Sequence, residues 1–314
     1  MESIQNLKKR IKSVTNINKI TKAMELVAAT KMRKAQEIAL ASRPYAFTAL
    51  DLLANISLIE KELPELLHER EIKAVLFVVI ASDKGLAGAF NSALFRKFEK
   101  HTKKHLEEYK NEEHLFVAVG EKAFQYLSRK QLSVVQKFTN FGDFTESNQV
   151  HPLTDFMVKG YLEKKWDRVI IISTHFHSAL KQESMVKKVL PIDYADLKET
   201  IKEILPENGR FAEMIKEQDI NFNERLENIN EYVIEPSPEI VLEKLVEHLF
   251  FMQVYHLILE ANASEHSARR LAMKTASDNA QDLKEKLNLQ YNKSRQAGIT
   301  NQIIEITAGS EAQQ

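Results

Sequence analysis

The loop Ile80–Asn91 is the part of this sequence best suited to bind a phosphate. It contains two glycines, follows an apolar run and precedes a helical pattern, the position at which α/β proteins hold phosphate groups. It matches neither G-x-x-x-x-G-K-[ST] nor G-x-G-x-x-G. We therefore predict a tight strand-to-helix turn here, and keep nucleotide binding as the alternative.

Two histidine pairs have spacings that could hold a metal ion. His101 and His105 lie four residues apart on a predicted helix, which is a chelating spacing. Their neighbours are charged, so we favour a solvated helix face. His175 and His177 point to one side of an extended segment, but no carboxylate or cysteine close in sequence completes a ligand set. We predict no metal site at either pair.

The sequence also offers no convincing catalytic group. No serine lies in a nucleophile elbow, and no carboxylate pair stands out from the charged helices. Cysteine is absent, which excludes disulfides, thiolate metal sites and a thiol nucleophile, and fits a reducing, intracellular compartment. We predict no catalytic residue, no metal and no cofactor.

Composition and length indicate a soluble chain of two units. The 314 residues are 44% hydrophobic, and the net charge is zero. No signal-peptide layout and no run of 18 apolar residues is present, although the chain could still bind a membrane complex. The first 43 residues are strongly basic, with ten Lys or Arg against three Glu. They could bind nucleic acid, acidic lipid or an acidic protein surface, or be a solvated lysine face.

Both ends of the chain are predicted to be very long helices. Residues 3–60 and 239–296 carry apolar positions three or four apart with no glycine, and each helix would extend roughly 80–90 Å. Two helices of this length cannot be buried by the rest of the chain, so we expect them to pair with each other and project outward, with an interruption at Pro44. The apolar positions of the first helix are Ile4, Leu7, Ile11, Val14, Ile17, Ile20, Met24, Val27, Met32, Ala35 and Ile38.

The C-terminal helix has an imperfect seam. Beyond Leu259, about half of the positions spaced by three and four are small or polar, whereas a stable two-stranded coiled coil prefers branched aliphatic residues there. We therefore expect another structure to surround this part of the helix. Ser237 is the predicted N-cap, with Pro238 in the first turn.

The middle of the chain is predicted to be a Rossmann-like wound α/β domain. Its apolar runs alternate with helical segments, which is typical of a parallel sheet covered on both faces. Residues 193–231 are polar and are interpreted as an insertion. The predicted divisions are 1–64 and 237–314 for the two long helices and 65–236 for the α/β domain. The expected strands are 74–80, 115–119, 168–173, a weaker Val134–Val135, and an edge strand over 185–191.

Four separated segments carry a resemblance to a known family. Ile20–Gln36 with Ser42–Tyr45, and Glu260–Ala280 with Tyr291–Thr300, resemble the terminal helices of the γ subunit of F-type ATP synthase, bacterial type. Ser82–Asn91 is similar to that family's glycine loop. The segments occur in the family's order and span nearly the whole chain.

The resemblance implies a rotor without catalytic sites of its own. In that family the paired N- and C-terminal helices form a long antiparallel coiled coil, the central stalk, inside the ring of α and β subunits, whose β subunits make ATP. The α/β domain is the foot on the c-ring, beside ε. One copy of the chain would couple proton flow to ATP synthesis or hydrolysis, regulate both, and lie peripherally on the cytoplasmic side of the cell inner membrane.

The resemblance also implies contact residues. Those implied for the α/β ring are Lys19, Lys22, Met24, Lys31, Arg269, Arg270, Thr275 and Asp278. Those implied for the c-ring are Tyr232 and Glu235. Without cysteines, the thiol switch of chloroplast relatives is excluded. Two rival interpretations are a small-molecule α/β enzyme with helical oligomerisation arms, and a basic coiled-coil scaffold for nucleic acid, although the predicted partners include no nucleic acid.

Overall fold

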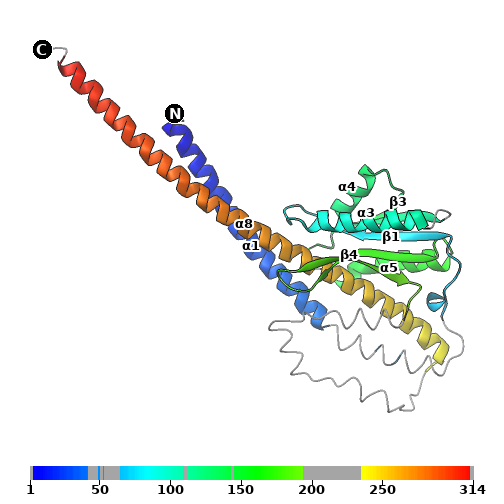
Figure 1. Cartoon of the computed structure of the whole chain (residues 1–314). Coiled ribbons are helices and arrows are strands. Elements are labelled where there is room, and N and C mark those ends of the chain that lie inside the picture. Colours follow the sequence, from blue (N-terminus) through cyan, green and yellow to red (C-terminus); the bar gives the residue numbers. More distant parts are fainter. Residues whose placement is uncertain are drawn as a thin grey trace. The chain divides into compact units, whose positions relative to one another are not determined.

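The computed structural model (Figure 1) describes residues 3–41, 49, 52, 64–108, 112–142, 145–193 and 235–311. The predicted break at Pro44 and nearly all of the predicted insertion lie outside these residues. Contacts divide the chain into two units: Met1–Ala28 with Arg269–Gln314, called here the helix-pair unit, and Ala29–Ala268, called the sheet unit. Helices α1 (Ile4–Ala41) and α8 (Pro238–Glu311) run through both.

The sheet has five strands in the order β3-β2-β1-β4-β5. Strands β1 to β4 run parallel to one another, and β5 runs antiparallel to β4 at one edge. The wound, Rossmann-like arrangement predicted from the sequence is confirmed. The strands are β1 (Ala74–Ile80), β2 (Glu113–Val119), β3 (Val134–Phe138), β4 (Arg168–Phe176) and β5 (Gln182–Leu190).

Helices cover both faces of the sheet, as the continuous apolar runs require. All seven residues of β1 are buried. One face packs against α3 (Phe90–Glu108) and α4 (Glu121–Arg129), and the other against α5 (Ser147–Leu162) and the first part of α8. Figure 1 shows α3 and α5 on opposite sides of β1 and β4.

Strand β5 confirms the predicted edge. It carries Lys187 and Lys188, which are only half-buried. Its antiparallel direction follows from the short connection to β4, which is closed by hydrogen bonds between the backbones of Ser178 and Lys181. A connection of this length cannot carry the chain back to the other end of the sheet, as a parallel pair would need.

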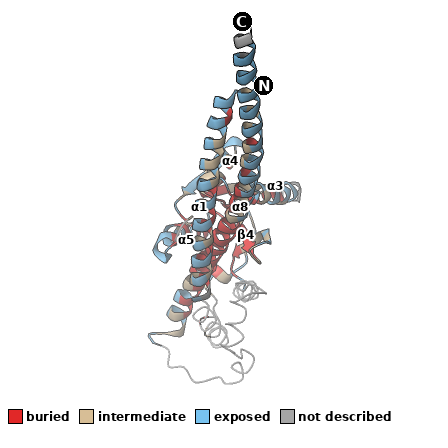
Figure 2. Cartoon of the chain, turned by 90° about the vertical axis from the view of Figure 1, so that its left-hand side faces the viewer, coloured by how far each residue is buried: buried red, intermediate tan, exposed pale blue. Residues whose placement is uncertain are grey.

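Helix α8 changes character along its length (Figure 2). It begins as predicted, with the backbone N–H of Ile240 donating to Ser237 Oγ at 3.4 Å. Every residue from 249 to 267 is buried, so this stretch is a core helix of the sheet unit. Beyond Arg269, the buried positions are Met273, Ser277, Ala280 and Leu287, whose intervals of four, three and seven place them on one face of a helix.

Helix α1 buries a heptad seam that coincides only in part with its apolar pattern. The seam alternates steps of four and three, the spacing of a coiled coil. Its buried positions are Leu7, Thr21, Glu25, Ala28, Met32, Ala35 and Ala39, with half-buried Ile11, Val14 and Asn18 between them. Of the apolar positions singled out in the sequence, Ile17, Ile20 and Val27 lie outside this seam and are exposed.

Within the part of the chain that the structure describes, none of the helices is both long enough and apolar enough to span a bilayer.

Candidate functional site

The seam of the helix-pair unit is polar at its centre. Asn18 Nδ2 donates to Gln281 Oε1 at 3.1 Å, and Ser277 Oγ donates to Asn18 Oδ1 at 2.9 Å. Ile4 lies next to Gly298, since its Cδ1 would be 3.6 Å from a Cβ placed there. The start of α1 therefore lies beside the later part of α8, so the two segments are antiparallel, as the family resemblance implies.

The apolar stripe of α1 faces outward, one residue out of step with this seam. Ile17, Ile20 and Val27 are 51%, 59% and 54% exposed, and Met24 between them is half-buried. One residue is about 100° of rotation around a helix. Polar residues hold the two helices together, therefore, while larger apolar side chains point away from the pair.

Helix α8 also displays apolar side chains in the helix-pair unit. Ile299, Ile303 and Ile306 recur at steps of four and three, and are 49%, 59% and 73% exposed. Contiguous exposed apolar surface usually marks a contact with another molecule. The pair therefore carries two outward-facing apolar stripes, one on each helix.

The implied ring-contact residues of α1 differ in their surroundings. Lys19 is exposed and Lys31 is half-buried. Lys22 Nζ lies 2.9 Å from Glu25 Oε2, so the charge of Lys22 is partly offset within its own helix. Met24 extends the apolar stripe. Lys19, Lys22 and Met24 lie within two turns in the helix-pair unit, whereas Lys31 belongs to the sheet unit.

The implied ring-contact residues of α8 also differ in how far they are exposed. Arg269 is buried, with 8% of its surface exposed, and is not a surface residue of this chain. Arg270 is half-buried, and both Thr275 and Asp278 are exposed. Thr275 Oγ1 donates to the carbonyl of Leu271 at 3.1 Å, so its hydroxyl already has a partner within the helix.

Of the two implied c-ring contacts, Glu235 is exposed, and Tyr232 lies outside the described residues.

The glycine loop forms the tight turn that the sequence predicts. Ser82 Oγ donates to the carbonyl of Lys84 at 2.8 Å and accepts from Asn91 Nδ2 at 2.7 Å. The carboxylate of Asp83 accepts two backbone N–H groups, from Glu121 at 3.0 Å and from Asn140 at 2.9 Å. Ser82 and Asp83 thus connect the loop to the ends of β1, β2 and β3. The backbone N–H groups that Asp83 accepts are of the kind that bind phosphate in nucleotide-binding loops, and here they already have a partner.

Gly120 explains how closely this turn is packed. Its φ is 91°, and a Cβ at this position would lie 2.0 Å from the carbonyl oxygen of Ala81. Only glycine allows β2 to end so close to the strand beside it.

The structure corrects the interpretation of both histidine pairs. His105 is buried, not solvated, because it faces β2 and the ring of Phe77, 5.5 Å away between centroids. His175 Nδ1 lies 2.9 Å from Glu260 Oε2, with both side chains buried. Glu260 comes from α8, 85 residues away, so no local pattern could have revealed this carboxylate.

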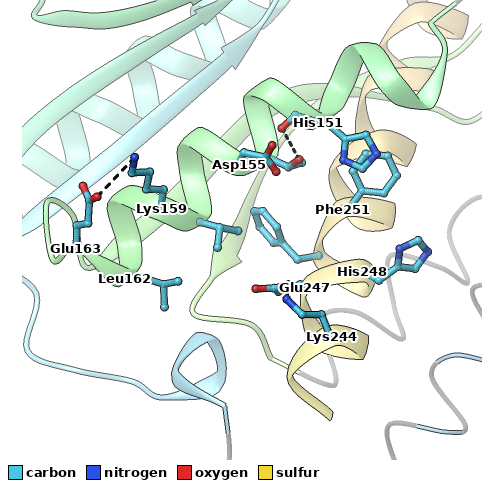
Figure 3. Close-up of a pocket in the computed structure, with 12 residues that line it drawn as sticks. His151, Asp155, Lys159, Leu162, Glu163, Lys244, Glu247, His248 and Phe251 are labelled. Atoms are coloured by element: carbon cyan, nitrogen blue, oxygen red, sulfur yellow. Dashed lines mark hydrogen bonds and ion pairs between the residues drawn. The ribbon is translucent and has the colours of Figure 1, made fainter. Parts of the chain in front are cut away.

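A groove of about 750 Å³ lies between α5 and α8 in the sheet unit (Figure 3). The ring of His151 stacks on Phe251 at 4.2 Å between centroids. Burial, and then the nearby His151, lower the pKa of His248. The lining combines aromatic side chains with two salt bridges, Lys159 to Glu163 at 3.9 Å and Lys244 to Glu247 at 2.8 Å. It contains no arrangement of nucleophile and base among the described residues.

Comparison with known proteins gives one family for the whole chain. Residues 3–313 match the family described as ATP synthase. The ATP synthase gamma chain of Moorella thermoacetica is 36% identical over 313 residues, covering 99% of both chains. That of Halothermothrix orenii is 34% identical over 314 residues, again with 99% of both chains covered.

Solved structures support the same fold. The rotor of the Euglena gracilis mitochondrial ATP synthase includes a chain that aligns with a TM-score of 0.57 at 17% identity, covering 94% of this chain and 98% of that one. A chain from the Tetrahymena thermophila central stalk and c-ring aligns with a TM-score of 0.56 at 24% identity, covering 82% and 99%. By full-length match and identity, the chain belongs to the ATP synthase family and, within it, to the gamma chains.

Proposed function

We propose that the helix-pair unit is the part of the central stalk that turns inside the α/β ring. The observation that carries this proposal is the separation of seam and stripe: Asn18 and Thr21 face the partner helix, while Ile17 and Ile20 face outward. An isolated helix pair would gain more by burying its isoleucines in the seam. A pair enclosed in a ring can instead place them against the wall of the ring.

The charge of the shaft suits the same role. Lys19 and Lys22 accompany the stripe on α1, and basic side chains attract an acidic partner surface over long range without a fixed apolar lock. The contact set proposed for the ring is Lys19, Lys22, Met24, Lys31, Arg270, Thr275 and Asp278. Because Arg269 is buried in its own chain, we assign it a supporting role.

We propose the remaining assignments on the family resemblance. Residues 1–64 and 237–314 would serve as the shaft and 65–236 as the foot, with Tyr232 and Glu235 contacting the c-ring beside ε. One such chain per complex, held peripherally on the cytoplasmic side of the inner membrane, would couple ion flow to ATP turnover on β and regulate both. The sheet unit then provides the rigid body against which the c-ring pushes.

The test is reconstitution with α and β subunits of the same organism. The wild-type chain should bind the mixture and raise its rate of ATP hydrolysis, and a mixture that neither binds the chain nor changes its rate would refute the rotor role.

Met24→Lys sharpens this test. A cation within the apolar stripe should lower ATP-driven proton pumping several-fold relative to hydrolysis in reconstituted vesicles. The matched control is Leu180→Lys, a similar substitution at a residue that is 81% exposed in the β4–β5 turn. It should pump like the wild type, and equal pumping by Met24→Lys would remove this residue from the contact set.

A further inference from the structure

One cluster of ligating side chains in the sheet unit takes no part in the rotor surface. His105 lies in the last turn of α3, Glu112 immediately precedes β2, and His114 is the second residue of β2. One ligand atom from each of the three lies within 4.8 Å of the others. We propose that His105, Glu112 and His114 form a binding site for a divalent transition-metal ion of the Zn²⁺ type.

The distances are those of a chelating pair with a third ligand close by. His105 Nδ1 and His114 Nε2 are 3.2 Å apart, and two nitrogens bound to one tetrahedral Zn²⁺ lie about 3.3 Å apart. Glu112 Oε2 is 3.8 Å from His105 Nδ1. A small rotation of the carboxylate would complete three protein ligands, leaving a fourth position for water, as in other sites with three protein ligands.

Burial separates this cluster from ordinary surface carboxylates and histidines. The side chains of His105 and Glu112 are 7% and 9% exposed. Glu112 Oε2 is buried and has no hydrogen-bond partner in the described part of the chain. A buried carboxylate oxygen without a hydrogen bond carries a desolvation cost, which a bound cation would remove.

The ligand types indicate which kind of ion would fit. Two imidazoles with one carboxylate favour Zn²⁺, Co²⁺ or Ni²⁺ over Mg²⁺ or Ca²⁺, which prefer oxygen ligands.

The site would join two elements of the sheet unit. His105 belongs to a helix on one face of the sheet, and His114 pairs in register with Val75 of β1. The ring of Phe77 packs against both imidazoles, 5.5 Å from His105 and 5.7 Å from His114 between centroids. A bound ion would therefore fasten the end of α3 to the start of β2, independently of the stalk's rotation.

Titration of the full-length chain with Zn²⁺ tests the proposal directly. The chain should carry no histidine tag and be stripped with a chelator first. Since it contains no cysteine, thiolates cannot supply the binding. We expect one tight site per chain by calorimetry and an unfolding temperature that rises with Zn²⁺. Absence of stoichiometric binding would overturn the proposal.

Three variants assign the ligands. His114→Ala should weaken Zn²⁺ binding by about 100-fold or more, because losing even an outer-shell partner costs about 10–100-fold. Glu112→Gln keeps the shape and should weaken binding by about 10-fold or more, which decides the question if His114→Ala fails to fold. The control His177→Ala removes a histidine whose partner is Glu183, and should bind as the wild type does. Wild-type affinity in Glu112→Gln would exclude this site.

Co²⁺ gives a second readout, because its visible absorption reports the ligand geometry. A site with three protein ligands should produce intense ligand-field bands in the wild-type chain and lose them in Glu112→Gln. A spectrum identical to that of hydrated Co²⁺ would contradict the assignment.

Discussion

The two halves of α8 belong to one continuous helix and have opposite surroundings. Residues 249–267 are all buried in the sheet unit, and the side chain of Phe250 is 0% exposed. In the helix-pair unit, Leu289 and Ile306 are 72% and 73% exposed. The first half is held by its own chain, whereas the second presents apolar side chains outward. The difference teaches that one stretch of the helix anchors it in its own chain, while another leaves its apolar side chains open to the partner contact that we propose.

Truncation of one large apolar residue in each half should expose this contrast most strongly. Phe250→Ala should lower the free energy of unfolding by about 3–5 kcal/mol, since it leaves a cavity in the core. Leu289→Ala should change it by less than about 0.5 kcal/mol, as for other exposed positions. Chemical denaturation of the full-length chain measures both, and equal losses would remove the distinction between the halves.

Acid should weaken the buried half of α8 first. Burial lowers the pKa of His256 to about 4, whereas the unfolded chain binds that proton near pH 6.5. Stability is therefore highest above pH 6.5 and falls as the pH drops toward 4, by about 3 kcal/mol from this group. No histidine follows His266 in the sequence, so the exposed half of α8 contains no histidine that could lower stability in this pH range.

His256→Gln tests this assignment. The variant should lose most of the pH dependence of unfolding between pH 6.5 and 4, while His177→Ala should keep it. An unchanged slope in the first variant would show that His256 does not carry the effect.

The polar centre of the helix-pair seam should be open to stabilisation. A buried asparagine in a coiled-coil seam fixes the register of the helices but lowers stability. Asn18→Leu should therefore stabilise the helix pair by about 1 kcal/mol, and slow amide hydrogen exchange in residues 4–28. Faster exchange would indicate that the bonds of Asn18 to Ser277 and Gln281 hold the pair together.

The sheet could be predicted from the sequence because the residue types within each strand indicate whether its two faces are buried. The run Ala74–Ile80 is apolar at every position, as expected for a strand that is covered on both faces of the sheet. Strand β1 has these bounds. The N-cap at Ser237 and the edge strand with Lys187 and Lys188 are local signals of the same kind. Such features depend on a few neighbouring residues.

The sites could not be predicted as well, because their partners come from distant segments. His105 is joined by Glu112 and His114 across a strand boundary, and His175 by Glu260 from another helix. The seam of α1 could not be predicted for a different reason. Apolar periodicity shows that a helix has an apolar face, but not whether that face meets its own partner helix or another molecule. Ile17 and Ile20 do not face the partner helix, and we propose that they meet another molecule.

The central claim, that this outward stripe is the surface covered by the ring, can be tested by thiol labelling. Since the chain has no native cysteine, Ile20→Cys and Thr21→Cys each place a single thiol, one on the stripe and one in the seam. In the isolated chain the first should react with a maleimide at least about 10-fold faster. After assembly with α and β subunits, Ile20→Cys should become as slow as Thr21→Cys. A stripe thiol that stays reactive in the assembled complex would contradict the account.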